Sequence, residues 1–184
     1  MMKLSIIIRT YNEAMHVGAL LKSIADQHAD QSRREIIVVD SGSTDGTVQL
    51  AESFGVRMLH IKKEEFSFGR SLNIGCAAAM GDVLVFISGH CVPASRDWLT
   101  ELTAPLGKNS VVYSYGRQMG NGHSYFSECR IFEKYFPAVS KIPQDDCYCN
   151  NANSALMKSV WERNRFDEDL TGLEDMHQIG RAHV

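Results

Sequence analysis

The sequence contains no apolar stretch that approaches the roughly 20 residues of a membrane-spanning helix. It has no surplus of basic residues either, because its net charge is −3, which argues against a nucleic-acid-binding protein. The hydrophobic run near the first residues is too short for the core of a signal peptide. We therefore expect no nucleic-acid partner, no integral membrane segment in this chain and a cytoplasmic location. Peripheral association with the inner face of the cell membrane stays open.

The five cysteines lack the even number and regular spacing of a secreted disulfide framework. Cys147 and Cys149 are separated by one residue, so they match neither a C-x-x-C redox motif nor a usual zinc knuckle. A zinc site would have to combine them with His90 and Cys91, and no feature of the sequence brings these two segments together. The thiols are therefore interpreted as buried or incidental.

The glycine-rich phosphate-binding motifs are also absent. The first predicted strand, 5–8, is followed by RTYNE instead of G-x-G-x-x-G, and no G-x-x-x-x-G-K-[ST] motif occurs in the chain. These absences argue against a Rossmann dehydrogenase and a P-loop enzyme. They also argue against a nucleotidyltransferase, which would need a triphosphate loop rich in Gly, Arg and Lys after the first strand.

What the sequence does contain is an alternation of short apolar runs and helical patterns. A chain of 184 residues, 44% of them hydrophobic, can bury one core, so we expect one domain. The alternation is typical of an α/β protein with a mainly parallel sheet and flanking helices. The predicted strands lie at 5–8, 36–39, 56–61, 83–88, 111–116 and 154–157. The predicted helices lie at 13–27 (with Asn12 as N-cap), from SGSTDGT to 54, and at 71–80, 98–106 and 125–136.

Two side chains at the ends of neighbouring predicted strands suit a nucleoside. Tyr11 follows the first strand, and Asp40 ends the second. An aromatic ring can cover a nucleobase, and a carboxylate can accept hydrogen bonds from a base or a ribose. The alternative for each residue is structural, because Tyr11 would then pack on the sheet edge and Asp40 would cap a turn.

The segments SIIIRTYNE and IIVVDSGSTDGT, followed by RSLNIG and then GD, resemble the nucleotide-binding half of family 2 glycosyltransferases. These motifs occur in the family's order and cover about the first half of the chain. The resemblance implies the GT-A fold, with a mixed, mainly parallel sheet. It also implies transfer of a hexosyl or deoxyhexosyl group, with inversion, from a nucleotide-sugar donor to a glycan or lipid-linked acceptor, in cell-surface polysaccharide synthesis. The residues that it places at the nucleotide-sugar site are Thr10, Tyr11, Glu13, Asp40, Arg70 and Asn73.

Ser88-Gly89-His90 stands where this family has D-x-D, whose last carboxylate holds a divalent metal on the diphosphate. The resemblance therefore makes His90 the candidate ligand of Mn²⁺ or Mg²⁺, although imidazole suits transition metals better than the hard ion Mg²⁺. There are two alternatives. A protonated His90 would offset the diphosphate charge directly, or His90 would only close a loop.

Near the end of the chain, the segment TGLED matches the family's E-D pair. By this resemblance Asp175 is the catalytic base that takes the proton of the acceptor hydroxyl, and Glu174 is its neighbour. The alternative is that both are ordinary acids in the first turn of a helix. The amide-rich segment 149–154 is interpreted as a polar cleft or a turn, since unpaired amides are costly in a core.

The resemblance also predicts that the chain is truncated at its C-terminus. Only nine residues follow Asp175, and the last seven, QIGRAHV, resemble the translation of a sequencing adapter. We therefore expect one incomplete GT-A domain over 1–177 and a non-native tail over 178–184. The main alternative function is a non-catalytic nucleotide-sugar-binding module, because D-x-D is missing and the chain is short.

Overall fold

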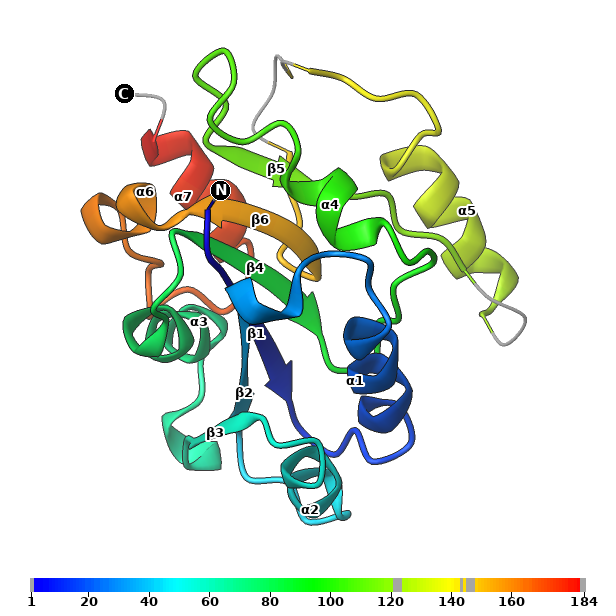
Figure 1. The fold of residues 1–184 in the computed structure, drawn as a ribbon, viewed down its shortest axis with the longest axis vertical. Coiled ribbons are helices and arrows are strands. Elements are labelled where there is room, and N and C mark those ends of the chain that lie inside the picture. Colours follow the sequence, from blue (N-terminus) through cyan, green and yellow to red (C-terminus); the bar gives the residue numbers. More distant parts are fainter. Residues whose placement is uncertain (1, 121–123, 143, 145–147, 183–184) are drawn as a thin grey trace.

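The computed structural model describes residues 2–120, 124–142, 144 and 148–182. Its centre is one six-stranded sheet with the strand order β3-β2-β1-β4-β6-β5 (Figure 1). The strands are β1 (Leu4–Thr10), β2 (Arg34–Asp40), β3 (Arg57–His60), β4 (Val83–Ser88), β5 (Tyr113–Tyr115) and β6 (Asn153–Met157). The strands β1 to β4 run parallel, whereas β6 is antiparallel to both β4 and β5. The predicted mixed, mainly parallel sheet is therefore confirmed.

Helices cover both faces of this sheet. In Figure 1, α1 and α4 lie on one side, and α3 and α6 lie on the other. The helices are α1 (Val17–Ala25), α2 (Thr47–Glu52), α3 (Phe68–Ala78), α4 (Trp98–Thr103), α5 (Phe126–Tyr135), α6 (Lys158–Arg163) and α7 (Glu174–Ala182). Within the described part of the chain, none of them is both long enough and apolar enough to cross a membrane.

The alternation of side chains along the strands builds two apolar layers. On β1, Ile6 and Ile8 belong to the layer beneath α1 and α4, whereas Ile7 packs in the layer beneath α3 and α6. Every residue of β4 is buried, because both of its faces are covered. This is why its sequence, VLVFIS, reads as a continuous apolar run instead of an alternating one.

Gly75 allows α3 to pack closely on the sheet. A Cβ atom at this position would lie 2.6 Å from Ile7 Cγ2 and 3.2 Å from Val39 Cγ2. Both neighbours are fully or almost fully buried strand residues with no space to move. The glycine of the RSLNIG motif therefore fixes the distance between α3 and the two central strands.

The strand register brings the segments singled out in the sequence to one edge of the sheet. Thr10 lies opposite Asp40, and Arg9 lies opposite Ser88. Because β6 runs antiparallel to β4, its first residue, Asn153, lies opposite Ile87 at the same edge. The loops after β1, β2 and β4 therefore meet the amide-rich segment at the carboxyl edge, where open α/β sheets bind their ligands.

The predicted N-cap of the first helix is wrong. The helix α1 begins only at Val17, with His16 at the cap position. Asn12 instead has a positive φ of 55°, and its side-chain oxygen accepts a hydrogen bond from Thr44 N at 2.9 Å. This bond ties the turn after β1 to the loop after β2, so the backbone does not enter a helix at residue 13. The six-residue helix α6 was not predicted from the sequence.

The helix α7 begins at Glu174 and continues to Ala182. The boundary predicted between 177 and 178 falls inside this helix. Gln178 and Ile179 are buried, and Gln178 Nε2 donates a hydrogen bond to Asn164 O at 2.8 Å. The non-native tail stays a prediction.

Candidate active site

Asp40 is completely enclosed at the end of β2. Its Oδ1 accepts hydrogen bonds from the backbone N–H groups of Gly42 (3.0 Å) and Ser43 (2.9 Å). Its Oδ2 accepts from the hydroxyls of Thr10 (3.1 Å) and Ser43 (2.5 Å). A carboxylate offers about four lone-pair positions, and these four bonds occupy them. Asp40 therefore shapes the loop after β2, and a nucleoside would have to displace one of these bonds to contact it.

Tyr11 lies on the surface immediately after β1, with 42% of its area exposed. The Lys63 ammonium lies 5.1 Å from the centroid of its ring, within the range of a cation–π contact. A hydrogen bond with Tyr11 and the charge of that residue raise the pKa of Lys63. A half-exposed ring beside a cation is suited to cover a nucleobase while the ammonium approaches a phosphate.

The Glu13 and His90 side chains form a hydrogen-bonded pair across the ends of β1 and β4. His90 Nδ1 lies 2.9 Å from Glu13 Oε1, and the His90 side chain is 59% exposed. Gly89 makes this approach possible, because a Cβ there would lie 3.0 Å from Arg9 O, Glu13 Cγ and Thr10 Cγ2. The pairing orients the imidazole and leaves its Nε2 available to a ligand at the D-x-D position.

At this position the described residues supply only some of the ligands that a divalent metal needs. They contain no group of three His, Cys, Asp or Glu side chains that could hold a metal ion. His90 supplies one nitrogen, and Glu13 orients its ring from the Nδ1 side, so diphosphate oxygens and water would have to complete the shell. The zinc site considered from the sequence includes Cys147, which lies outside the described residues.

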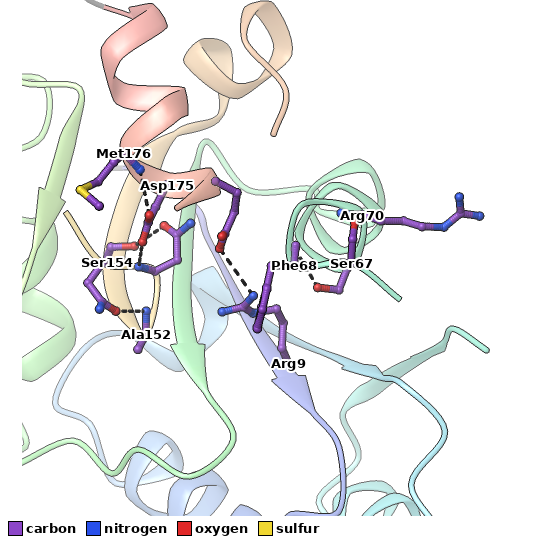
Figure 2. Close-up of polar contacts among 12 residues, drawn as sticks. Arg9, Ser67, Phe68, Arg70, Ala152, Ser154, Asp175 and Met176 are labelled. Atoms are coloured by element: carbon purple, nitrogen blue, oxygen red, sulfur yellow. Dashed lines mark hydrogen bonds and ion pairs between the residues drawn. The ribbon is translucent and has the colours of Figure 1, made fainter. Parts of the chain in front are cut away.

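Arg70 and Asn73 lie on α3, away from the acidic pair. Figure 2 shows the Arg70 side chain extending away from Arg9 and Asp175, and its Nη1 lies 3.8 Å from Glu168 Oε2. Asn73 is buried, and its amide makes four hydrogen bonds to Phe166, Glu168 and Trp161, which bind the segment after α6 to α3. Asn73 therefore has no free donor or acceptor for a nucleotide sugar.

A pocket of about 240 Å³ opens beside the acidic pair. Asp175 Oδ2 accepts a hydrogen bond from Asn151 N at 3.2 Å, and Asp175 Oδ1 accepts from Met176 N at 2.8 Å (Figure 2). Two backbone N–H groups, one from the loop before β6 and one from α7, thus orient this carboxylate at the N-terminus of α7. The residues that line the pocket are Arg9, Phe68, Asn150, Asn151, Ala152, Gly172, Leu173, Glu174 and Asp175.

The amide-rich segment is both of the things that its composition suggested. It forms a turn before β6, and its residues Asn150 to Ala152 line the pocket. Asn151 is buried, and its Oδ1 accepts hydrogen bonds from Ser154 Oγ (3.1 Å) and from Tyr113 Oη (3.4 Å). Its Nδ2 has no hydrogen-bond partner among the described residues.

Sequence reasoning missed Arg9 and Phe68 as site residues. Arg9 Nη1 lies 3.8 Å from Glu174 Oε1, and the Arg9 guanidinium carbon lies 5.1 Å from the centroid of the Phe68 ring (Figure 2). The one available signal was the position of Arg9, a charge directly after the apolar run SIII in a strand buried on both faces. Nothing in the sequence indicates that its partner is Glu174, which lies far along the chain.

Comparison with known proteins agrees with these motifs. The family model "Glycosyl transferase family 2" matches residues 5–162. The O-antigen chain rhamnosyltransferase RfbN of Salmonella typhimurium is 26% identical over 98% of this chain and 60% of its own length. Glycosyltransferase AglE of Haloferax volcanii is 33% identical over 52% of this chain and 32% of its own length. The chain therefore spans less than two thirds of either relative.

Solved structures show the same fold. The mannosyltransferase PcManGT of Pyrobaculum calidifontis, in complex with GDP-Man and Mn²⁺, matches with a TM-score of 0.78 and 21% identity, over 98% of this chain and 52% of that chain. TarS of S. aureus matches with the same TM-score and identity, over 98% of this chain and 55% of that chain. The motifs, the mixed sheet and the family match over 5–162 agree, and the chain belongs to family 2 of the glycosyl transferases, with the GT-A fold.

Proposed function

We propose that the chain transfers a sugar, with inversion, from a nucleoside-diphosphate donor to a hydroxyl of a glycan or lipid-linked acceptor in cell-surface polysaccharide synthesis. The observation that carries this proposal is the oriented Asp175 carboxylate in a pocket at the carboxyl edge of the sheet. The names of relatives support the donor class, because PcManGT was solved with GDP-Man and TarS with UDP-GlcNAc. RfbN, a rhamnosyltransferase of O-antigen chains, supports the acceptor class.

Inverting transfer requires a base on one side of the sugar and a leaving diphosphate on the other. In the proposed reaction, the acceptor oxygen attacks the anomeric carbon, and Asp175 takes the hydroxyl proton. The new C–O bond forms as the bond between the anomeric carbon and the phosphate oxygen breaks, and the diphosphate keeps that electron pair. Asp175 suits the base role because two backbone donors fix its direction before any substrate binds.

The nucleotide half of the donor would lie over the loops after β1, β2 and β4. Tyr11 would cover the base, Lys63 would approach the phosphates, and the loop shaped by Asp40 would border the ribose. His90, oriented by Glu13, would contribute to holding a divalent metal, which supplies positive charge to the departing diphosphate. Thr10 supports this arrangement through Asp40, whereas we leave Asn73 out of the donor site because its amide is fully bonded.

Release of nucleoside diphosphate tests the proposed function. The purified chain is incubated with UDP-, GDP- and dTDP-sugars, with and without glycan or lipid-linked acceptors, and nucleoside diphosphate is quantified. We expect release with at least one donor and a rate that rises with acceptor. A non-catalytic binding module would bind the same nucleotides in calorimetry and release nothing, and that result would reject the enzyme.

Replacing His90 by alanine should weaken nucleoside-diphosphate binding in the presence of Mn²⁺ by about 10- to 100-fold, the value of one charge-assisted contact. Calorimetry with and without Mn²⁺ measures the effect, and the gain from Mn²⁺ should shrink in the variant. His28→Ala is a matched control, because His28 forms a similar exposed pair with Asp97 at 3.0 Å on a different pair of loops. Equal affinities for the two variants would remove His90 from the diphosphate site.

A further inference from the structure

Arg9 is a mostly buried cation without a full set of partners. Its side chain is 15% exposed, and its Nη1 has no hydrogen-bond partner among the described residues. The nearest acid is Glu174, at 3.8 Å, which is an ion-pair distance but too long for a hydrogen bond. The Phe68 ring covers the guanidinium at 5.1 Å. Arg9 is thus enclosed between an aromatic ring and one carboxylate.

Such a cation is costly in a core unless an opposite charge or hydrogen bonds compensate for its lost hydration. Burial lowers the pKa of Arg9, and the negative charges of Glu174 and Asp175 oppose that effect. An apolar side chain would suit the end of a buried strand better, as Ile6 to Ile8 show on the same strand. The charge at this position is therefore explained by its partner on α7 and not by the packing of β1.

We propose that Arg9 is the positioning residue of the acidic pair: it anchors Glu174, and through Glu174 it fixes the N-terminus of α7 and the direction of the Asp175 carboxylate. This inference deepens the proposed function and rests on it for the role of Asp175. All three residues line the same pocket. Arg9 comes from the central strand, so the anchor connects the rigid sheet to the loop that enters α7.

The loop before α7 needs such an anchor. Leu173, directly before Glu174, has a positive φ of 62°, which an L-residue with a side chain rarely adopts. Backbone in that region persists only where its surroundings hold it. The bonds that Asp175 receives from Asn151 and Met176 act on one side of the turn, and the Arg9 ion pair acts on the other.

Among the residues that the structure describes, two charged groups act on Glu174. Arg9 comes from β1, and Asp175 comes from its own helix. Tyr113 of β5 and Tyr148 face Asp175, and burial raises the pKa of both phenols, so they are neutral near pH 7. Burial raises the pKa of Glu174, and a backbone hydrogen bond and Arg9 lower it in part. Arg9 therefore supplies the positive charge that favours an ionised Glu174.

The first experiment measures the titration of Glu174 in the full chain by carboxyl NMR, with Glu174→Gln to assign the signal. Arg9→Met should raise the pKa of Glu174 further, because an opposite charge within 4–6 Å is lost. Arg9→Lys keeps the charge and should give a smaller shift. Arg34→Met removes an arginine of β2 that bonds to Ala25 O at the far end of the sheet, and it should give no shift.

The second experiment measures how the unfolding midpoint depends on pH, because a general packing defect would not produce the dependence expected here. A Glu whose folded pKa is raised loses stability as pH rises from its unfolded value through its folded value. Arg9→Met raises the folded value further, so its deficit in unfolding midpoint relative to wild type should grow over that pH range. In the Glu174→Gln background most of this pH dependence should disappear, because Glu174 is the carboxylate that interacts most strongly with Arg9.

The third experiment measures turnover and nucleoside-diphosphate affinity separately. Arg9→Met should lower turnover at least ten-fold while nucleoside-diphosphate affinity stays within two-fold, and Arg9→Lys should recover part of the turnover. An unchanged Glu174 titration in Arg9→Met, or an equal loss of turnover in Arg34→Met, would overturn the positioning role. A wild-type chain that releases no diphosphate but shows the Arg9-dependent titration would reject the proposed function and leave the anchor in place.

Discussion

Asp175→Asn should lower sugar transfer by about 10²- to 10⁴-fold, the usual contribution of a positioned general base. The substitution removes the group that accepts the acceptor's proton but keeps the shape of the side chain. One of the two backbone bonds, from Asn151 N or from Met176 N, can still be accepted by the amide oxygen. The measurement is acceptor-dependent release of nucleoside diphosphate under saturating donor.

The same variant should bind nucleoside diphosphate with nearly wild-type affinity, because the loops proposed to hold the nucleotide lie after β1, β2 and β4 and not on α7. Asp169→Asn is the matched control: it makes the same chemical change at an exposed acid six residues earlier, and it should leave turnover unchanged. Near-normal turnover in Asp175→Asn would show that another residue is the base. A parallel loss in Asp169→Asn would point to a general charge effect instead.

The sheet could be predicted because its signal is local. Buried parallel strands such as VLVFIS are short apolar runs, and β4 begins and ends where the run does. The carboxyl edge followed from the same reasoning, since parallel strands end at one side. The start of α1 could not be predicted in this way. It depends on a hydrogen bond between Asn12 and Thr44, two residues that meet only after β1 and β2 have paired.

In the site, too, local motifs could be predicted from the sequence and long-range contacts could not. The resemblance placed Glu174 and Asp175 in the motif TGLED, and these two residues share a pocket. Their anchor on β1 was missed, because a lone arginine after an apolar run gives no information about a partner far along the chain. For Asp40, the sequence suggested a ligand contact where the structure shows hydrogen bonds within the protein. Its sequence context suits a nucleoside ligand and a turn cap equally, and only the four bonds to its carboxylate show that it holds the turn.

For Asn73, measurements of stability and of nucleotide binding distinguish a structural role from a role in the donor site. Its Nδ2 donates to Phe166 O and to Glu168 Oε1, both at 2.9 Å. Its Oδ1 accepts from Trp161 Nε1 at 2.9 Å and from Phe166 N at 3.1 Å. One buried amide therefore holds the segment after α6 against α3. The family resemblance placed Asn73 at the nucleotide-sugar site, and this bonding favours a structural role instead.

Asn73→Leu, which keeps the branched shape of the side chain, should lower the free energy of unfolding by about 3–5 kcal/mol, because it leaves several buried polar groups without partners. The unfolding midpoint should fall by roughly 6–20 °C. Adding Trp161→Phe removes one of the orphaned donors, so the double variant should be more stable than the sum of the two single changes predicts. Below the transition, Asn73→Leu should bind nucleoside diphosphate within about three-fold of wild type, a difference of less than 1 kcal/mol. A folded Asn73→Leu variant with ten-fold weaker binding would instead return Asn73 to the donor site, as the family resemblance implied.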